Sequence, residues 1–306
     1  MKPSPDDVLS GLTRPVFCAS PGKSLLIVDY ASIEARVLAW LAGQEDMLRI
    51  FRDDGDVYLD MATAIYGRTV TAKDETERQV GKVVVLGAGY GLSGRRCGAY
   101  CALQRVDLQA AGTSGEECIA AYRAKYPRIP ALWREYDRAT KCAIERGPTD
   151  AGRCHFAYDG GTLTIVLPSG RPLYYRGASL QPRVPAYCKL LGLPEDPKPT
   201  VVYAKRPGLE GTLYGGLITE NIDQAVSRDI MATALVRVEA ARLDPVLHVH
   251  DEIVAETDPG RLEEMCRLMV DTPEWARGLP LAVEGYPCSH YSKSPFAGTK
   301  KIKIRA

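Results

Sequence analysis

The sequence of 306 residues lacks several features that would each point to a particular class of protein. It has no run of eighteen apolar residues, so no membrane-spanning helix and no membrane partner are expected. Its first residues, Met-Lys-Pro-Ser-Pro-Asp-Asp, contain no apolar segment of the kind that a secretory signal needs. We therefore expect a cytoplasmic protein. No internal repeat and no low-complexity tract is present.

The nine cysteines do not form the patterns that bind zinc or build a disulfide framework. They are spread singly and are odd in number, which favours free thiols in a reducing compartment. Cys97 and Cys101 are four residues apart and could begin a metal site on a helix. Because no second pair follows at a zinc spacing, we do not expect structural zinc.

The composition is that of an ordinary globular protein, with 45% hydrophobic and 25% charged residues. A chain of this length suits one large domain or two closely associated ones. The net charge of +1 argues neither for nor against nucleic acid, but Arg68 to Arg105 holds seven Lys or Arg against three Asp or Glu. A solvated face is the usual reading of such a run. Here the run includes the motif between Arg78 and Gly91, so a phosphate-facing surface is favoured.

The stretch from Lys82 to Gly94 allows two opposed interpretations. As a strand and turn, it is an apolar run ending in Gly89-x-Gly91-x-x-Gly94, the fingerprint of a dinucleotide-binding oxidoreductase. Asp107 then lies about where a ribose-binding acid is expected. As a helix, the same stretch places cations, an apolar residue and an aromatic on one stripe, at Arg78, Lys82, Leu86 and Tyr90. Each signal is weak by itself.

Two acidic motifs flank this stretch and decide between the interpretations. Asp29-Tyr-Ala-Ser-Ile-Glu34-Ala-Arg36 precedes it, and His250-Asp251-Glu252 follows it. The three motifs, in this order, resemble those of the family A DNA polymerases, the group of bacterial DNA polymerase I and many bacteriophage replicases. The family's second motif is helical and reads Arg-x3-Lys-x3-aromatic-Gly-x2-Tyr-Gly. The present chain matches it except at Leu86, so the resemblance favours the helix.

The acidic motifs have residue types that suit nucleotidyl transfer. That reaction develops charge on the attacking and leaving oxygens together, and two divalent cations about 3.5–4 Å apart stabilise it. Asp29 ends an apolar strand, and Asp251 lies at the tip of a predicted hairpin; they could share the cations if the two strands are neighbours. The resemblance implies this adjacency. It also implies that Asp29, Asp251 and the Tyr30 backbone carbonyl bind two Mg²⁺ ions, or Mn²⁺, with Glu252 as an accessory acid.

The resemblance implies further roles along the chain. Arg78 and Lys82 would bind the incoming triphosphate, and Lys82 would also be catalytic, as the proton donor to pyrophosphate. Glu34 would exclude a ribose hydroxyl. The residues expected beside the sugar and base are Leu86, Gly87, Tyr90 and Gly91. Those expected against the primer–template are His250, Gln224 and Arg228.

The resemblance also implies a fold, which is α+β. We expect a palm of antiparallel sheet backed by helices, formed by residues 1–36 and 208–306, and a mainly helical fingers domain at residues 37–207. Strands are predicted at residues 24–29, 161–168 and 171–176, and helices at residues 32–42, 75–90, 114–146 and 220–243. Residues 181–211, rich in Pro and Gly, are predicted to form a loop.

The family's thumb and 3′–5′ exonuclease segments find no counterpart before Asp29. The expected partners are therefore primer–template DNA, deoxynucleoside triphosphates and, as one possibility, a second polypeptide that supplies the thumb or the exonuclease. The expected function is template-directed DNA synthesis in a bacterial or phage-infected cell. The alternative from another class is a non-catalytic subunit that binds primer–template DNA without extending it.

Overall fold

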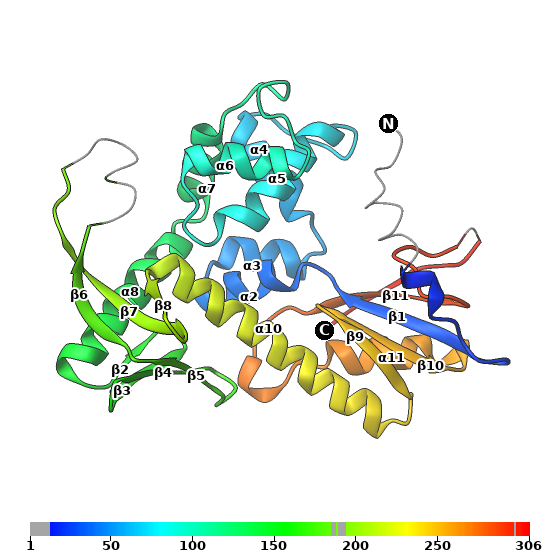
Figure 1. The fold of residues 1–306 in the computed structure, drawn as a ribbon. Helices are drawn as coiled ribbons and strands as arrows, with labels where there is room; N and C mark the ends of the chain where they lie inside the picture. Colours follow the sequence, from blue (N-terminus) through cyan, green and yellow to red (C-terminus); the bar gives the residue numbers. More distant parts are fainter. Residues whose placement is uncertain (1–12, 185–187, 189–193, 297) are drawn as a thin grey trace. The chain divides into compact units, whose positions relative to one another are not determined.

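The structure is a computed structural model that describes residues 13–184, 188, 194–296 and 298–306 (Figure 1). It separates into two units. Unit 1 comprises Met1–Arg36 and Ser227–Ala306, and unit 2 comprises Val37–Val226. The fold is α+β with antiparallel sheets, which confirms the predicted class. The limits given above for palm and fingers stay a prediction.

Unit 1 contains one sheet and the helices beside it. Its elements are η1 (Arg14–Val16), β1 (Ser24–Tyr30), β9 (Pro245–Val249), β10 (Glu252–Thr257), η2 (Pro259–Arg261), α11 (Leu262–Val270), η3 (Glu274–Ala276), β11 (Ala282–Cys288) and β12 (Ile302–Arg305). Two helices, α2 (Ile33–Ala42) and α10 (Gly215–Ala240), continue across the boundaries of the units in sequence.

The strand β1 lies at the centre of the five-stranded sheet, whose order is β12-β11-β1-β10-β9. It pairs antiparallel with β10 on one side and with β11 on the other. Its residues from Leu25 to Val28 are all buried, on both faces of the sheet. A continuous apolar run is the expected sequence of a strand covered on both faces. The predicted strand at residues 24–29 is therefore confirmed.

One face of this sheet is covered by α11. The helix buries Leu262, Met265, Cys266 and Met269, which recur at the spacing of a single helical face. A Cβ atom added at Gly285 of β11 would lie 3.0 Å from the Cys266 Sγ and 2.9 Å from Val28. The glycine thus lets the helix approach the sheet closely. The other face buries a cluster made of Leu25, Ile27, Val254, Tyr286, Cys288 and Tyr291.

Unit 2 contains helices and two small antiparallel sheets. Its helices are α3 (Glu45–Arg52), α4 (Val57–Tyr66), α5 (Glu75–Ala88), α6 (Gly94–Leu103), α7 (Gly115–Lys125) and α8 (Arg128–Arg146). One sheet has the order β2-β3-β4-β5, with β2 (Thr149–Ala151), β3 (Cys154–Asp159), β4 (Thr162–Val166) and β5 (Pro172–Arg176). The other has the order β6-β7-β8, with β6 (Ser179–Arg183), β7 (Lys198–Arg206) and β8 (Leu209–Leu213).

The second sheet corrects the prediction of a loop at residues 181–211 in part: residues 181–183, 198–206 and 209–211 are in strands, and residues 185–187 and 189–193 lie outside the described residues. The prolines there led to a loop assignment, because proline cannot donate a hydrogen bond to a strand ladder. In the structure Pro182 of β6 and Pro199 of β7 face each other at one position of the ladder. Their missing donors therefore coincide, and the branched residues Thr200 to Val202 continue the strand.

Across the described residues, no helix is both long and apolar enough to cross a membrane.

Candidate active site

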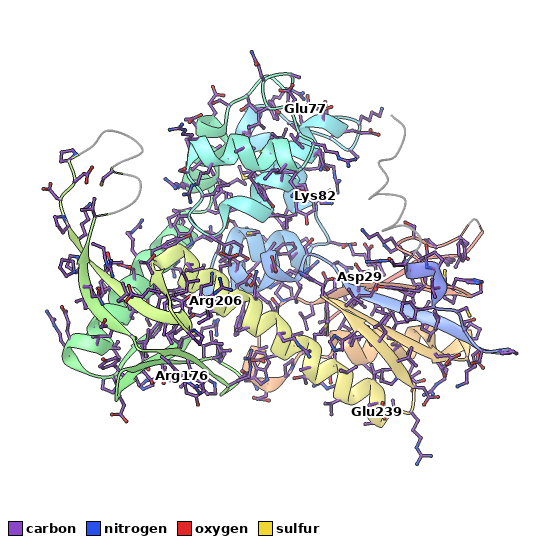
Figure 2. The ribbon with its side chains drawn as sticks, viewed as in Figure 1. Asp29, Glu77, Lys82, Arg176, Arg206 and Glu239 are labelled. Atoms are coloured by element: carbon purple, nitrogen blue, oxygen red, sulfur yellow. The ribbon has the colours of Figure 1, made fainter. Side chains whose placement is uncertain are left out.

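The two acidic motifs lie on neighbouring strands of unit 1. In the β1–β10 pair, Asp29 is directly opposite Glu252, and the amide of Tyr30 donates a 3.1 Å hydrogen bond to the carbonyl of Asp251. Residues in direct register on two antiparallel strands have their Cβ atoms about 5 Å apart. The sheet therefore brings together carboxylates that are more than two hundred residues apart in sequence. Figure 2 labels Asp29 at the end of β1.

The turn between β9 and β10 consists of two residues, His250 and Asp251, because Val249 pairs with Glu252. His250 adopts a left-handed conformation, with φ of 56°, as a tight two-residue hairpin requires at its first position. Its imidazole is largely exposed, and its Nδ1 lies 3.6 Å from the Asp251 Oδ1. The hairpin thus presents Asp251 at its tip and leaves the histidine accessible.

The carboxylates of this region form a partly buried, acidic group. Burial raises the pKa of Asp29; Lys301 opposes this, and the charges of Asp251 and Glu284 add to it. Lys301 itself forms an ion pair with Glu284. The net effect is a carboxylate whose ionised form is disfavoured by its surroundings. A cation placed beside it would reverse this preference.

Glu252 is in a similar environment. Burial raises its pKa, and the hydroxyl of Tyr291 donates a hydrogen bond to its carboxylate, which lowers the pKa. The guanidinium of Arg14 lies 4.8 Å from the centre of the Tyr291 ring and also favours the ionised form of Glu252. Glu252 is therefore held by protein groups, whereas the charge of Asp251 acts on Asp29 and raises its pKa.

The donor set fits hard divalent cations of the Mg²⁺ type. Such ions prefer oxygen ligands and commonly take one or two protein carboxylates, with water and substrate phosphates completing the shell. Asp29 and Asp251 offer two carboxylates. Within the described parts of the chain no group of three or more His, Cys, Asp or Glu could hold a metal ion. Two carboxylates are the number of protein ligands that such an ion commonly takes.

Residues beside Asp29 have defined positions in unit 1. The phenol of Tyr30 is buried and donates a 2.7 Å hydrogen bond to the carbonyl of Met269, so only its backbone faces the acidic group. Glu34 lies in the first turn of α2 and is partly exposed. Arg36 donates to the carbonyls of Ala31 and Pro280, at 2.6 and 2.8 Å, and so anchors α2 at its start.

The predicted motif helix exists in unit 2 as α5, which ends at Ala88, two residues before the predicted limit at Tyr90. Its valines at positions 80, 83, 84 and 85 are buried, whereas Arg78, Lys82 and Leu86 are partly exposed on the opposite stripe. The strand-and-turn interpretation of this stretch is therefore wrong, because residues 75–88 are helical. The described sheets are also antiparallel, unlike a dinucleotide-binding fold.

The two cations of the stripe differ in their contacts. The Nε of Arg78 donates a 2.7 Å hydrogen bond to Asp56, and its guanidinium lies 5.6 Å from the centre of the Tyr58 ring. Asp56 also accepts hydrogen bonds from the amides of Tyr58 and Leu59 and so caps α4. Lys82 makes no ion pair among the described residues, and Figure 2 labels it on α5. Arg78 is thus pre-oriented, whereas the ammonium of Lys82 is available.

The glycines of the motif helix are explained by protein contacts. In the structure a Cβ atom at Gly81 would lie 2.1 Å from the carbonyl oxygen of Tyr58, and one at Gly87 would lie 2.5 Å from the ring of Tyr100. The neighbouring helices α4 and α6 therefore occupy the space that these glycines leave.

Tyr90 follows the end of α5 and is fixed by contacts that the sequence did not reveal. Its hydroxyl donates a hydrogen bond to the carboxylate of Asp223 on α10. The indole of Trp133 donates a 2.7 Å hydrogen bond to the carbonyl of Gly89. Gly91 has φ of 85° and lies against the backbone of Gly216. These contacts join residues far apart in sequence, so no local pattern could have predicted them.

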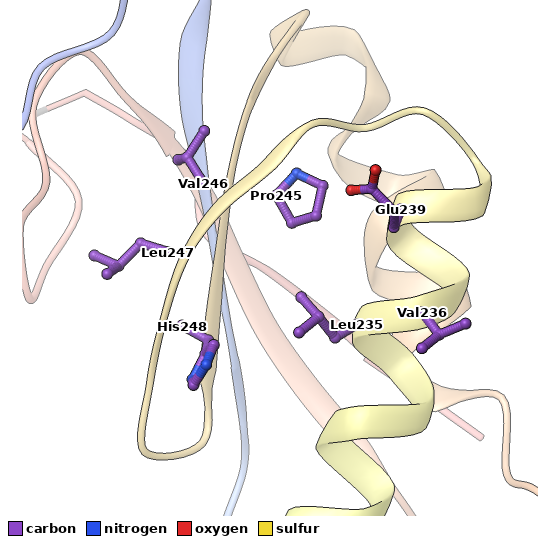
Figure 3. A pocket seen from close by; sticks show the side chains of 7 residues that line it. All are labelled: Leu235, Val236, Glu239, Pro245, Val246, Leu247 and His248. Carbon is purple, nitrogen blue, oxygen red and sulfur yellow. The ribbon is translucent and has the colours of Figure 1, made fainter.

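The remaining predicted residues lie on the surface of α10. Gln224 and Arg228 are both exposed, one helical turn apart. An apolar groove of unit 1 is a separate feature (Figure 3). It is lined by Leu235, Val236, Glu239, Pro245, Val246, Leu247 and His248. None of the acidic residues described above lines it.

Comparisons with known proteins agree with these motifs. Residues 7–147 match the model of the family "DNA polymerase family A". The sequence is 34% identical over 296 residues to a DNA polymerase of Bacillus phage SP02, covering 94% of this chain and 44% of the phage protein. It is 27% identical over 264 residues to DNA polymerase I of Chloroflexus aurantiacus, covering 84% of this chain and 22% of that protein.

A solved structure has a similar fold. The polymerase domain of Pol1 from M. smegmatis, in complex with a DNA primer-template and dNTP, aligns with a TM-score of 0.56 and 18% identity. The alignment covers 91% of this chain and 42% of that chain. The present chain is thus similar to the family A DNA polymerases, and the resemblance inferred from the motifs is confirmed. It spans less than half the length of the relatives named here.

Proposed function

We propose that the chain is the catalytic part of a template-directed DNA polymerase, which adds deoxynucleotides to a primer 3′-hydroxyl. One observation supports this most strongly: the register of β1 and β10, which sets Asp29 opposite Glu252 and beside Asp251. Two carboxylates on the rigid ends of neighbouring strands are the arrangement that nucleotidyl transfer requires.

In this proposal the primer 3′-oxygen attacks the α-phosphorus, and the bond from that phosphorus to pyrophosphate breaks. Asp29 and Asp251, with the Tyr30 carbonyl, would hold two Mg²⁺ ions, which when bound stabilise charge on the attacking and leaving oxygens. The raised pKa of Asp29 supports this role, because burial and the neighbouring acids favour a bound cation over a bare carboxylate. Glu252, held by Tyr291, keeps the hairpin oriented.

The partly exposed stripe of α5 would bind the triphosphate. Arg78 is oriented by Asp56 and would contact phosphate oxygens with its remaining N–H groups. The available ammonium of Lys82 would donate a proton to the departing pyrophosphate. The different contacts of the two side chains support different roles, binding for Arg78 and proton transfer for Lys82.

Residues around the incoming nucleotide and the DNA would select the substrate. Glu34, at the start of α2, would leave no room for a ribose hydroxyl. Tyr90, with Leu86 and the glycines at positions 87 and 91, would flank the new base pair. The exposed His250 would contact the primer terminus, and the exposed Gln224 and Arg228 would contact the primer–template.

The test is primer extension by the purified chain on four templates that differ only in the templating base. We expect each template to direct incorporation of its complementary deoxynucleotide, and Asp251→Asn to abolish it. The matched control is Asp258→Asn, beyond the other end of β10, where Asp258 caps η2 and asparagine caps equally well. Binding of primer–template without extension would instead support the non-catalytic alternative.

A further inference from the structure

Asp223 is a buried carboxylate that the proposed reaction does not use. It lies on α10 between Ile222 and Val226, and all three side chains are fully buried. A buried carboxylate is costly unless hydrogen bonds compensate it. The hydroxyl of Tyr90 donates such a bond, across 133 positions of sequence. This buried carboxyl therefore has a specific partner, and that partner is in the motif proposed to bind the nucleotide.

The environment of Asp223 strengthens this contact. Two other phenols, of Tyr122 and Tyr136, are fully buried nearby. Burial raises the pKa of both, and the charge of Asp223 contributes to each rise. The region is thus poor in water and rich in tyrosine. A hydrogen bond between a phenol and a carboxylate is stronger there than at the surface.

The backbone on both sides of Tyr90 is also fixed. Trp133 holds the carbonyl of Gly89 through its indole N–H, at 2.7 Å. A Cβ atom added at Gly216 would lie 2.2 Å from the carbonyl oxygen of Tyr90, so the start of α10 touches the chain at this residue. With the backbone clamped and the hydroxyl bound, the ring of Tyr90 has one defined position.

We propose that Asp223 is a positioning residue for Tyr90, and that it makes nucleotide selection depend on a ring held in one place. This rests on the proposed polymerase function. Asp223 would act through Tyr90 without touching the substrate. A ring fixed beside the new base pair clashes with a mismatched pair, which has a different shape. A ring without its hydrogen bond can move aside, so the mismatched pair can bind.

The test compares Tyr90→Phe, Asp223→Asn and the double variant. Tyr126→Phe is the control, because it removes a comparable 2.9 Å hydrogen bond, from Tyr126 to Asp60, in the same unit; Tyr126 is fully buried, whereas Tyr90 is partly buried. Each protein is measured for kcat/KM with the matched and with a mismatched deoxynucleotide. Hydrogen exchange of the amides at positions 89–92 is measured as well.

We expect Tyr90→Phe to lose about tenfold in discrimination, the effect of one hydrogen bond to a charged group, and Asp223→Asn to lose less, because the asparagine oxygen can still accept from Tyr90. The double variant should lose no more than Tyr90→Phe alone, because both substitutions act on the same contact: phenylalanine removes its donor, and asparagine removes only the charge of its acceptor. Exchange at positions 89–92 should quicken in Asp223→Asn. Tyr126→Phe should lower the melting temperature but change neither discrimination nor this exchange.

Unchanged discrimination in both single variants of an active enzyme, or equal changes in Tyr126→Phe, would overturn the assignment of Asp223. Additive losses in the double variant would overturn it too. A wild-type chain that extends no primer would refute the proposed function instead. In that case hydrogen exchange still decides whether Asp223 positions Tyr90, with equal rates in wild type and Asp223→Asn refuting it.

Discussion

The packing of α4 against α5 sets the position of the motif helix, and Gly81→Ala tests it. The added Cβ atom would lie 2.1 Å from the carbonyl oxygen of Tyr58, 3.0 Å from the amide nitrogen of Ala62 and 3.1 Å from its Cβ. These are backbone or near-backbone atoms that cannot rotate away, so the helices must separate by about 1 Å or more. Overpacking of this kind costs about 3 kcal/mol. Alanine regains about 1 kcal/mol in helix propensity, so the net loss is about 2 kcal/mol.

The matched control is Gly98→Ala in α6, another glycine inside a helix. An added Cβ atom there meets nothing within 4 Å, so only the propensity gain of about 0.5–1 kcal/mol remains. The two substitutions should therefore shift the urea midpoint in opposite directions, Gly81→Ala downward by roughly 1 M. A Gly81→Ala midpoint equal to or above that of the wild type would refute the close packing.

Three further predictions concern the proposed site. Glu34→Ala should raise the incorporation of rCTP relative to dCTP on one template, because space opens beside the sugar; an unchanged ratio would show that Glu34 is not the gate. Lys82→Ala should lower kcat, whereas Arg78→Ala should mainly raise KM, because a proton donor acts only in the transition state. If both variants changed only KM, and by the same factor, Lys82 would not be the proton donor. Asp29→Asn should stabilise the metal-free protein at neutral pH. Folding raises the pKa of Asp29 above its ordinary value of 3.8, so its ionised form destabilises the native state. The stability gained by Asp29→Asn should decrease as pH falls through the folded-state pKa of Asp29 toward 3.8. Urea midpoints of both proteins at pH 7 and pH 3.5 measure this gain in stability. A gain that is the same at both pH values would contradict the assigned cause.

The sequence predicted the elements whose signals are local. An unbroken apolar run gave β1, and the stripe of Arg78, Lys82 and Leu86 gave α5, although the glycines within it weaken its helix propensity. The loop assigned to residues 181–211 was wrong at residues 181–183, 198–206 and 209–211, because two prolines that face each other do not break a sheet as single prolines do. Local composition contains no information about such pairing.

The residues of the candidate site were also predictable only where their signal is local. The acidic motifs could be recognised in sequence, but their adjacency depended on a pairing between strands that only the structure displays. Asp56 and Asp223 were not identified at all. Each acts by a contact with a residue far away in sequence, Arg78 in one case and Tyr90 in the other. A lone aspartate beside a helix start or inside an apolar stripe gives no local sign of its partner.

Single-nucleotide incorporation by the wild type and by Asp29→Asn, titrated with Mg²⁺, tests the central claim most directly. Primer–template binding is measured in the same samples. The proposed site predicts that the wild-type rate rises with Mg²⁺ to a plateau. Asp29→Asn should stay about 100-fold lower at every concentration, with DNA affinity changed by less than about threefold. Incorporation by Asp29→Asn above about a tenth of the wild-type rate at saturating Mg²⁺ would contradict the assignment of the paired carboxylates.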